Sequence, residues 1–267
     1  MGRKTNLNSK LLKTTAIEAA LAGGRVLRKH FGKPLKIQEK ARANLVSNAD
    51  LEAEKAIIGI LKRRLKNAAP EMGFLAEESG QIGIPQDQWI LDPLDGTHNF
   101  IHGFPNFCVS LAAKLKGEIV LGVIYQPLTK ELYVAEKGRG ALLNGKKIKV
   151  SKTQFLVDSL LTTGFSYHRG DLSKEVQAFE RISAETLGIR RPGSAAMDLA
   201  YVARGVFDGY WERHLSPWDV AAGILLVREA GGVVTDFSGT SSQVHDRQIL
   251  AANPKVHTQL LKILSPS

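Results

Sequence analysis

Residues 89–97 read Trp-Ile-Leu-Asp-Pro-Leu-Asp-Gly-Thr, an apolar run that ends in two carboxylates, a glycine and a hydroxyl. The proline after Asp92 makes the backbone at this point rigid and disfavours a helix before Leu94. It can also turn the carbonyl of Leu94 toward a cation. Gly96 and Thr97 then open a new segment, whose free N–H groups would make a seat for a phosphate group.

Two further carboxylate clusters stand beside apolar runs. Glu77 and Glu78 follow the apolar residues 72–76, and Asp219 follows a tryptophan at the start of a predicted helix. An isolated Asp-x-x-Asp-Gly segment is usually a turn or a helix cap. The three clusters together favour a metal site, because two ions about 3.5–4 Å apart need several converging carboxylates. Hard oxygen ligands of this kind suit Mg²⁺.

Hydrophobic periodicity and turn signals place helices and strands around these clusters. The predicted helices cover residues 9–31, 50–65, 174–187, 194–203 and 217–230, with a last one after Pro254, and Leu51 is predicted to face inward. The predicted strands cover an extended pair within 35–46 and residues 72–76, 89–91, 107–114, 119–125, 131–135, 160–163, 206–211, 233–235 and 249–252. This order of helices, sheet, helices, sheet and helix predicts a layered sandwich.

Composition excludes several classes of protein. The chain has 267 residues, of which 43% are apolar and 23% charged, so disordered and fibrous classes do not fit. The single cysteine, Cys108, excludes a disulfide-stapled secreted module and is predicted to lie in the core. No charge-free apolar stretch approaches the ~18 residues of a membrane span. Lys13 and Glu18 interrupt the first apolar run, so we expect no signal peptide and a cytoplasmic protein.

The formal net charge of +10 is concentrated at the start of the chain. Residues 1–70 carry 16 basic and 5 acidic side chains, whereas residues 71–267 carry 20 and 21. A basic face would attract an anionic substrate or a nucleic acid. For any single run, such as the basic residues 62–64, we favour the alternative of a solvated helix face.

Three other kinds of site do not fit the sequence. Residues 140–147 match most of a phosphate-binding P-loop but end in lysine where a hydroxyl must hold Mg²⁺. Asn144-Gly145 within them predicts a hairpin turn instead. One cysteine and seven scattered histidines argue against a zinc site. A Gly-x-Ser-x-Gly elbow of a serine hydrolase is absent from the sequence.

Five segments carry a family resemblance. They are residues 77–79 (Glu-Glu-Ser), 89–100 (WILDPLDGTHNF), 193–205 (GSAAMDLAYVARG) and 218–223 (WDVAAG) with 229–232 (EAGG). On these segments the chain, from about residue 10 to 255, resembles the inositol monophosphatase family of Mg²⁺-dependent, lithium-sensitive phosphatases. It is most similar to the bacterial branch that includes the extragenic-suppressor protein, some members of which are reported to associate with transcription machinery.

The resemblance implies a fold and a set of metal ligands. Residues 1–267 would form a single domain, an α+β fold of the sugar-phosphatase type with five layers in the order αβαβα. The positions that match a first metal site are Glu77, Asp92 and the carbonyl of Leu94, and those that match a second are Asp92, Asp95 and Asp219. Glu78 matches a position that helps a third, weaker ion.

The resemblance also implies residues that act on the substrate. Asp50 and Thr97 match the catalytic pair that orients the attacking water. Gly96 and Thr97 match the phosphate seat, and Ser194 and Ala195 with Glu212 match positions that hold the substrate's ring. Together with the metal ligands, the implied substrate-binding set is Glu77, Asp92, Leu94, Asp95, Gly96, Thr97, Ser194, Ala195, Glu212 and Asp219. His98 and Asn44 depart from the residues of many members, without removing a metal ligand.

These observations predict hydrolysis of a phosphate monoester by metal-activated water, with two or three Mg²⁺ ions and inositol monophosphate as the favoured substrate. The alternative substrates are fructose 1,6-bisphosphate, a nucleotide 3′-phosphate and histidinol phosphate. The alternative class is a binding module whose basic N-terminal region contacts RNA or transcription machinery. We also expect a homodimer and no contact with a membrane.

Overall fold

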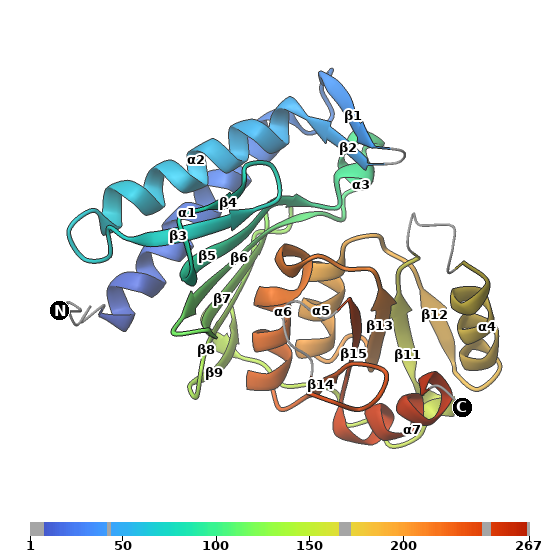
Figure 1. Ribbon diagram of the computed structural model, residues 1–267. Helices are drawn as coiled ribbons and strands as arrows, with labels where there is room; N and C mark the ends of the chain where they lie inside the picture. Colours follow the sequence, from blue (N-terminus) through green and yellow to red (C-terminus); the bar gives the residue numbers. More distant parts are fainter. Residues whose placement is uncertain (1–7, 42–43, 166–171, 242–246, 266–267) are drawn as a thin grey trace.

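The computed structural model describes residues 8–41, 44–165, 172–241 and 247–265 and has five layers (Figure 1). From one face to the other they are two helices, an eight-stranded sheet, two helices, a five-stranded sheet and two helices. The predicted αβαβα order of an α+β fold is therefore confirmed. Within the described ranges, no helix has the length and apolar character needed to cross a membrane.

Helices α1 (Ser9–His30) and α2 (Asn48–Leu65) form the first outer layer, joined by the short strands β1 (Ile37–Ala41) and β2 (Asn44–Ser47). A capping box starts α2: the side chain of Ser47 accepts from the helix backbone, and the carboxylate of Asp50 accepts from the N–H of Ser47 at 2.8 Å. This local device buries Asp50 at the helix start.

The predicted inward position of Leu51 in α2 is wrong, because its side chain is 50% exposed. Asp50 occupies the inward position instead, and the next residue is rotated away by about 100°. The inward face of α2 consists of Ala49, Asp50, Ala53, Glu54, Ile57, Leu61 and Leu65. Two carboxylates, Asp50 and Glu54, therefore lie within an otherwise apolar face.

The eight-stranded sheet has the order β10-β9-β8-β7-β6-β5-β3-β4. Its strands are β3 (Met72–Ala76), β4 (Gly80–Ile82), β5 (Ile84–Asp95), β6 (Cys108–Leu115), β7 (Glu118–Gln126), β8 (Glu131–Glu136), β9 (Gly140–Leu143) and β10 (Lys146–Lys147). The pairing of β3 with β5 is parallel and the other pairings are antiparallel. Asn144 and Gly145, both with positive φ, form the predicted hairpin turn.

Helices α5 (Ala195–Ala203) and α6 (Pro217–Glu229) form the middle layer, between the two sheets (Figure 1). Their approach to the eight-stranded sheet is close. A Cβ atom at Gly122 of β7 would lie 2.8 Å from the backbone oxygen of Ala222, so glycine is required there. The residues of α6 are consequently apolar nearly all round, as expected for a helix covered on both sides.

The five-stranded sheet has the order β12-β11-β13-β15-β14 and is covered by α4 (Leu172–Ser183) and α7 (Pro254–Leu264). Its strands are β11 (Leu160–Thr163), β12 (Gly188–Arg190), β13 (Gly209–Arg213), β14 (Val233–Thr235) and β15 (Gln248–Ala252), and a 3₁₀ turn, η1 (Leu156–Asp158), precedes them.

Two predicted boundaries in this half are wrong. The helix predicted over 174–187 ends at Ser183, because the N–H of Leu187 pairs with the carbonyl of Ser159 and leads into β12. The strand predicted from residue 206 begins at Gly209, because Gly205 adopts a φ of +76° and turns the chain after α5.

Candidate active site

Asp92 and Asp95 lie at the end of β5, on either side of an irregularity in the strand pairing. Asp92 pairs with Ser110 of β6 and Asp95 with Cys108, so three steps along β5 match two steps along β6. In a regular strand, residues three apart point to opposite faces. The extra residue between the two aspartates returns them to the same face. The Asp-Pro-Leu-Asp spacing thus aligns two buried carboxylates, which are 2% and 8% exposed.

Thr97, the first residue of the short helix α3 (Thr97–Ile101), connects this strand end to α2. Its hydroxyl oxygen lies 3.1 Å from Oδ1 of Asp50 and 3.0 Å from the carbonyl oxygen of Leu94. A hydroxyl has one proton, so it donates to one of these oxygens at a time and keeps lone pairs that accept.

The carboxylate of Asp50 is held from its other side by Ser47. Oδ2 of Asp50 accepts from the Ser47 N–H at 2.8 Å and from the Ser47 hydroxyl at 2.6 Å. Burial raises the pKa of Asp50, and the hydrogen bonds from Ser47 partly offset that increase. Asp50 is therefore a fixed carboxylate that accepts a proton more readily than an exposed aspartate.

Gly96 makes the turn between β5 and α3. Its φ is +97°, and a Cβ atom there would lie 2.9 Å from the carbonyl oxygen of Asn106. Asn99 of α3 donates from Nδ2 to the carbonyl oxygens of Asn106 and Pro192, at 2.7 Å each. The sequence prediction did not find this tie between the two halves of the chain, although Asn99 lies within the quoted motif.

The start of α5 holds Asp95. Oδ2 of Asp95 accepts from the hydroxyl of Ser194 at 2.5 Å and from the N–H of Ala196 at 2.7 Å. Ala195, between these two residues, is 9% exposed. Cys108 is buried beside Asp95, in the core position that the sequence predicted. Ser194, expected at the substrate's ring, has its hydroxyl engaged with Asp95 in this structure.

Asp219 and Glu77 approach the same region from two other elements. Asp219 lies in the first turn of α6, where its Oδ2 accepts from the Ser216 N–H at 2.7 Å. The hydroxyl of Ser110 in β6 donates to the carbonyl of the preceding Trp218 at 3.2 Å. Glu77 directly follows β3, and both residues are half-buried. The first turn of α6 is thereby tied to the strand that pairs with β5.

The four carboxylates influence one another electrostatically. Burial raises the pKa of Asp92 well above its usual range, and the charges of Glu77, Asp95 and Asp219 raise it further. Burial likewise raises the pKa of Asp219, with further increases from Asp95 and Glu77. A divalent cation would relieve this repulsion, and the donors are all hard oxygens. The residues therefore fit Mg²⁺.

The described part of the chain contains no ready-made cluster in which three or more His, Cys, Asp or Glu side chains are arranged to hold a metal ion. The structure brings Glu77, Asp92, Asp95 and Asp219 within electrostatic range, but it does not place them as coordinating ligands around one point. Their assignment as ligands therefore stays a proposal.

Glu212 faces this region from β13 of the second sheet. Its Oε2 accepts from the hydroxyl of Tyr210 at 2.6 Å. Burial raises the pKa of Glu212 to about 7, and the charge of Asp95 contributes to the increase. Asp198, in the first turn of α5, is buried, and its pKa is raised well above its usual range by burial and then by Glu212 and Asp95. Asp198 lies within residues 193–205, which carry the family resemblance, but the sequence did not predict that it belongs to the site.

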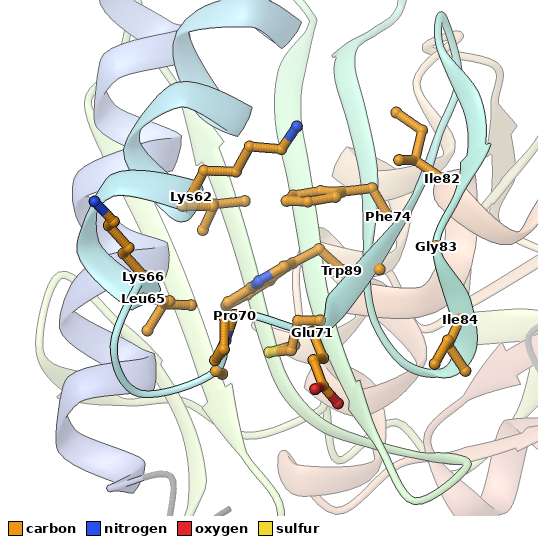
Figure 2. Close-up of a pocket in the computed structure, with 14 residues that line it drawn as sticks. Lys62, Leu65, Lys66, Pro70, Glu71, Phe74, Ile82, Gly83, Ile84 and Trp89 are labelled. Carbon is orange, nitrogen blue, oxygen red and sulfur yellow. The ribbon is translucent and has the colours of Figure 1, made fainter.

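A hollow of about 500 Å³ lies elsewhere, between the C-terminal half of α2 and strands β3 and β4 (Figure 2). Its walls are mainly apolar, with Phe74 and Ile84 among them, and they include Lys62 of α2 and Lys66 just after this helix. The predicted catalytic, metal-binding and substrate-binding residues do not line it. Apolar walls do not suit a doubly charged phosphate, so the carboxylate region is the candidate active site.

Comparison with known proteins identifies the family. The sequence profile of the Inositol monophosphatase family matches residues 8–266. The chain belongs to the inositol monophosphatase family. It is 45% identical over 254 residues to the inositol-1-monophosphatase of Synechocystis, which covers 94% of this chain and 87% of that protein. It is 40% identical over 253 residues to the Nus factor SuhB of Salmonella typhimurium, with 93% of each covered.

A solved structure shares the fold. The extragenic suppressor protein suhB from Bartonella henselae superposes with a TM-score of 0.90 at 43% sequence identity, covering 95% of this chain and 98% of that chain. The family resemblance and the enzyme class predicted from the sequence are thus confirmed. The chain is a phosphatase, and phosphatases of this family depend on a metal ion.

Proposed function

We propose that the protein hydrolyses the phosphate monoester of a small polyol, with inositol monophosphate as the favoured substrate, by using metal-activated water. The observation that carries this proposal is the group of carboxylates from β3, β5 and α6, whose charges raise one another's pKa beside the Asp50–Thr97 pair. The residues that would hold two Mg²⁺ ions are Glu77, Asp92, Asp95, Asp219 and the Leu94 carbonyl, with Glu78 beside a third.

The chain's own groups orient the reacting water. When bound, Mg²⁺ supplies Lewis-acid stabilisation of the phosphate's charge and lowers the pKa of water. The Thr97 hydroxyl donates to Asp50 and accepts from a water proton, so it aligns that water toward the phosphorus. Asp50, whose pKa burial raises, is the final proton acceptor. Gly96 and Thr97, at the start of α3, would form the seat for the phosphate group.

A panel of phosphate esters tests this function. Release of inorganic phosphate from inositol phosphate, fructose 1,6-bisphosphate, a nucleotide 3′-phosphate and histidinol phosphate is measured with Mg²⁺, with EDTA, and after Mg²⁺ is added back. We expect hydrolysis that EDTA abolishes and Mg²⁺ restores, fastest on inositol phosphate. Hydrolysis that persists in excess EDTA would contradict the metal site, and a faster reaction on another ester would change the substrate.

A second role in transcription is a separate proposal, because four relatives named Nus factor SuhB are 40–42% identical to this chain, in alignments that cover 93–94% of their length. The basic residues 1–70 would supply the contact with RNA or a protein of the transcription complex. A homodimer and lithium inhibition are also proposals drawn from the family resemblance, and a cytoplasmic location is a proposal drawn from the sequence. Binding of labelled RNA to a catalytically inactive variant tests whether the two roles are independent.

Glu212→Gln is expected to raise the KM for inositol phosphate by about tenfold and to leave an aryl phosphate unaffected. A hydrogen bond from a substrate hydroxyl to a carboxylate contributes about 1.5–3 kcal/mol, and an aryl ester has no such hydroxyl. Because the pKa of Glu212 is about 7, the wild-type KM should fall as the pH rises through 7. The variant should lose that pH dependence. Equal losses on both esters would place Glu212 in the chemical step or in folding.

Charge reversal of Arg63 and Arg64 is expected to change kcat/KM by less than about twofold at 0.1 M salt. Both arginines pair with Glu18, and they lie about 20 Å along α2 from Asp50. That distance is about two Debye lengths at this ionic strength. Long-range steering by these two residues is therefore small. Measurement of kcat/KM against ionic strength checks this. A fall of about tenfold in the variant would contradict it and show that these arginines attract the substrate over a long distance.

A further inference from the structure

Helix α2 carries two buried carboxylates one helical turn apart. Asp50 and Glu54 are four residues apart and lie on one face, and Glu54 is only 4% exposed. Whereas Asp50 reaches Thr97, Glu54 reaches the turn that follows β3. Oε2 of Glu54 accepts from the backbone N–H of Glu78 at 3.0 Å, and Oε1 accepts from the hydroxyl of Ser79.

The turn of residues 77–79 needs such a tether because its two sides are unequally supported. On one side it continues β3, and the N–H of Glu77 donates to the carbonyl of Leu91 in β5 at 3.1 Å. On the other side it leads into β4, a three-residue strand at the edge of the sheet. An edge strand is paired on one side only and is easily displaced. Glu54 fixes this weaker side to a helix.

We propose that Glu54 is a positioning residue for the metal site, which fixes the turn carrying Glu77 and Glu78 relative to the helix carrying Asp50. The inference rests on the proposed function, in which Glu77 holds Mg²⁺ and Asp50 orients the water. Helix α2 then fixes the positions of both the turn that carries the metal ligand Glu77 and the proton acceptor Asp50. Hydrogen bonds to a carboxylate are about twice as strong as those between neutral groups, which suits a tether of two bonds.

Three variants test the tether. Glu54→Ala removes both hydrogen bonds, and Ser79→Ala removes one without opening a buried cavity. Glu54→Gln keeps an acceptor for the Glu78 N–H, and its amide can donate to the Ser79 hydroxyl. Two quantities are measured: the Mg²⁺ dissociation constant by titration calorimetry without substrate, and the Mg²⁺ concentration that gives half-maximal phosphate release.

We expect Glu54→Ala to weaken Mg²⁺ binding by about 10–100-fold, as changes to groups that orient metal ligands do. Ser79→Ala should weaken it by a smaller factor, and Glu54→Gln should remain within about threefold of wild type. At saturating Mg²⁺, the KM for an aryl phosphate should stay unchanged in all three. A purely structural role of Glu54 would not separate the Mg²⁺ requirement from the KM in this way.

Glu229 offers a matched control. It ends α6 and accepts from the N–H groups of Gly138 and Gly140 at 2.7 Å each, so it also ties a turn to a helix through two hydrogen bonds. This turn contains none of the proposed metal ligands. Glu229→Ala should lower the thermal unfolding temperature, as we also expect for Glu54→Ala, and leave the Mg²⁺ dissociation constant unchanged.

Unchanged Mg²⁺ affinity in a folded Glu54→Ala protein would overturn the proposal, and so would an equal loss of affinity in Glu229→Ala. If Glu54→Ala does not fold, Ser79→Ala decides, and an unchanged Mg²⁺ affinity there overturns it. The proposed metal site itself is tested separately by Asp92→Asn. Normal Mg²⁺ binding by that variant rejects the site, whatever Glu54 does.

Discussion

Asp92→Asn is expected to lower kcat by about 10³-fold or more while the protein remains folded. Asp92 is assigned to both Mg²⁺ ions, and asparagine offers the same shape without the charge. Its Oδ1 can still accept from the N–H of Leu94, as Asp92 does at 2.9 Å, so the strand end should keep its conformation. Steady-state phosphate release at several Mg²⁺ concentrations measures the effect.

The same variant should make the metal-free protein more stable. Burial and the neighbouring carboxylates raise the pKa of Asp92, so the folded chain binds its proton more tightly than the unfolded chain, whose value lies near 3.8. Metal-free wild type therefore gains stability as the pH falls from the folded pKa toward 3.8. The Asp92→Asn substitution removes part of this pH dependence and raises the unfolding temperature at pH 7.

Asp208→Asn provides the comparison for Asp92→Asn. Asp208 is also a buried carboxylate that accepts from a backbone N–H, that of Leu160 at 2.7 Å, but it directly precedes β13 of the second sheet. We expect normal turnover and a normal Mg²⁺ requirement from it. Full turnover by Asp92→Asn at saturating Mg²⁺ would show that Asp92 is not a metal ligand.

Asp50→Asn is expected to lower kcat by about 10²–10⁴-fold with little change in Mg²⁺ affinity, because a positioned general base contributes about that much. Asparagine can still accept hydrogen bonds from Ser47 but cannot take a proton from Thr97. Thr97→Val should show a similar loss, and Thr97→Ser, which keeps the hydroxyl, should be mild. Single-turnover measurements separate the chemical step from product release.

Glu52→Gln serves as the control on the same helix. Glu52 is exposed and contacts His30, so its charge lies outside the candidate site. Its kcat should equal that of wild type. A kcat in Asp50→Asn within about threefold of wild type would remove Asp50 from the mechanism, since general-base contributions are far larger.

The fold could be predicted from the sequence where local signals were strong. Helices α1 and α2 begin and end within two residues of their predicted limits, because caps and apolar periodicity mark them. The end of α4 was not predicted, because no local sequence signal indicates that residues 188–190 pair with a strand 28 residues earlier. The inward face of α2 was misread at Leu51 because a carboxylate, not a leucine, occupies that face.

The candidate site was predictable as a set of residue types and not as a set of contacts. The Asp-Pro-Leu-Asp spacing predicts a bend. Only the pairing with β6 shows that this bend brings the two aspartates to the same face of the sheet. Glu54 gives no sequence signal, because its partners lie 24 and 25 residues away in a turn. The same holds for Asn99, whose partner Pro192 comes from the other half of the chain.

The hydrogen bonds between Asp95 and the start of α5 have a consequence for the newly synthesised protein. During synthesis, Asp95 leaves the ribosome well before Ser194, and 124 residues before Asp219. At 5–20 residues per second, about 6–25 s pass between the synthesis of Asp95 and the synthesis of Asp219. If Asp219 holds the metal ion as proposed, hydrolytic activity requires translation past this residue, so a chain interrupted before it would be inactive.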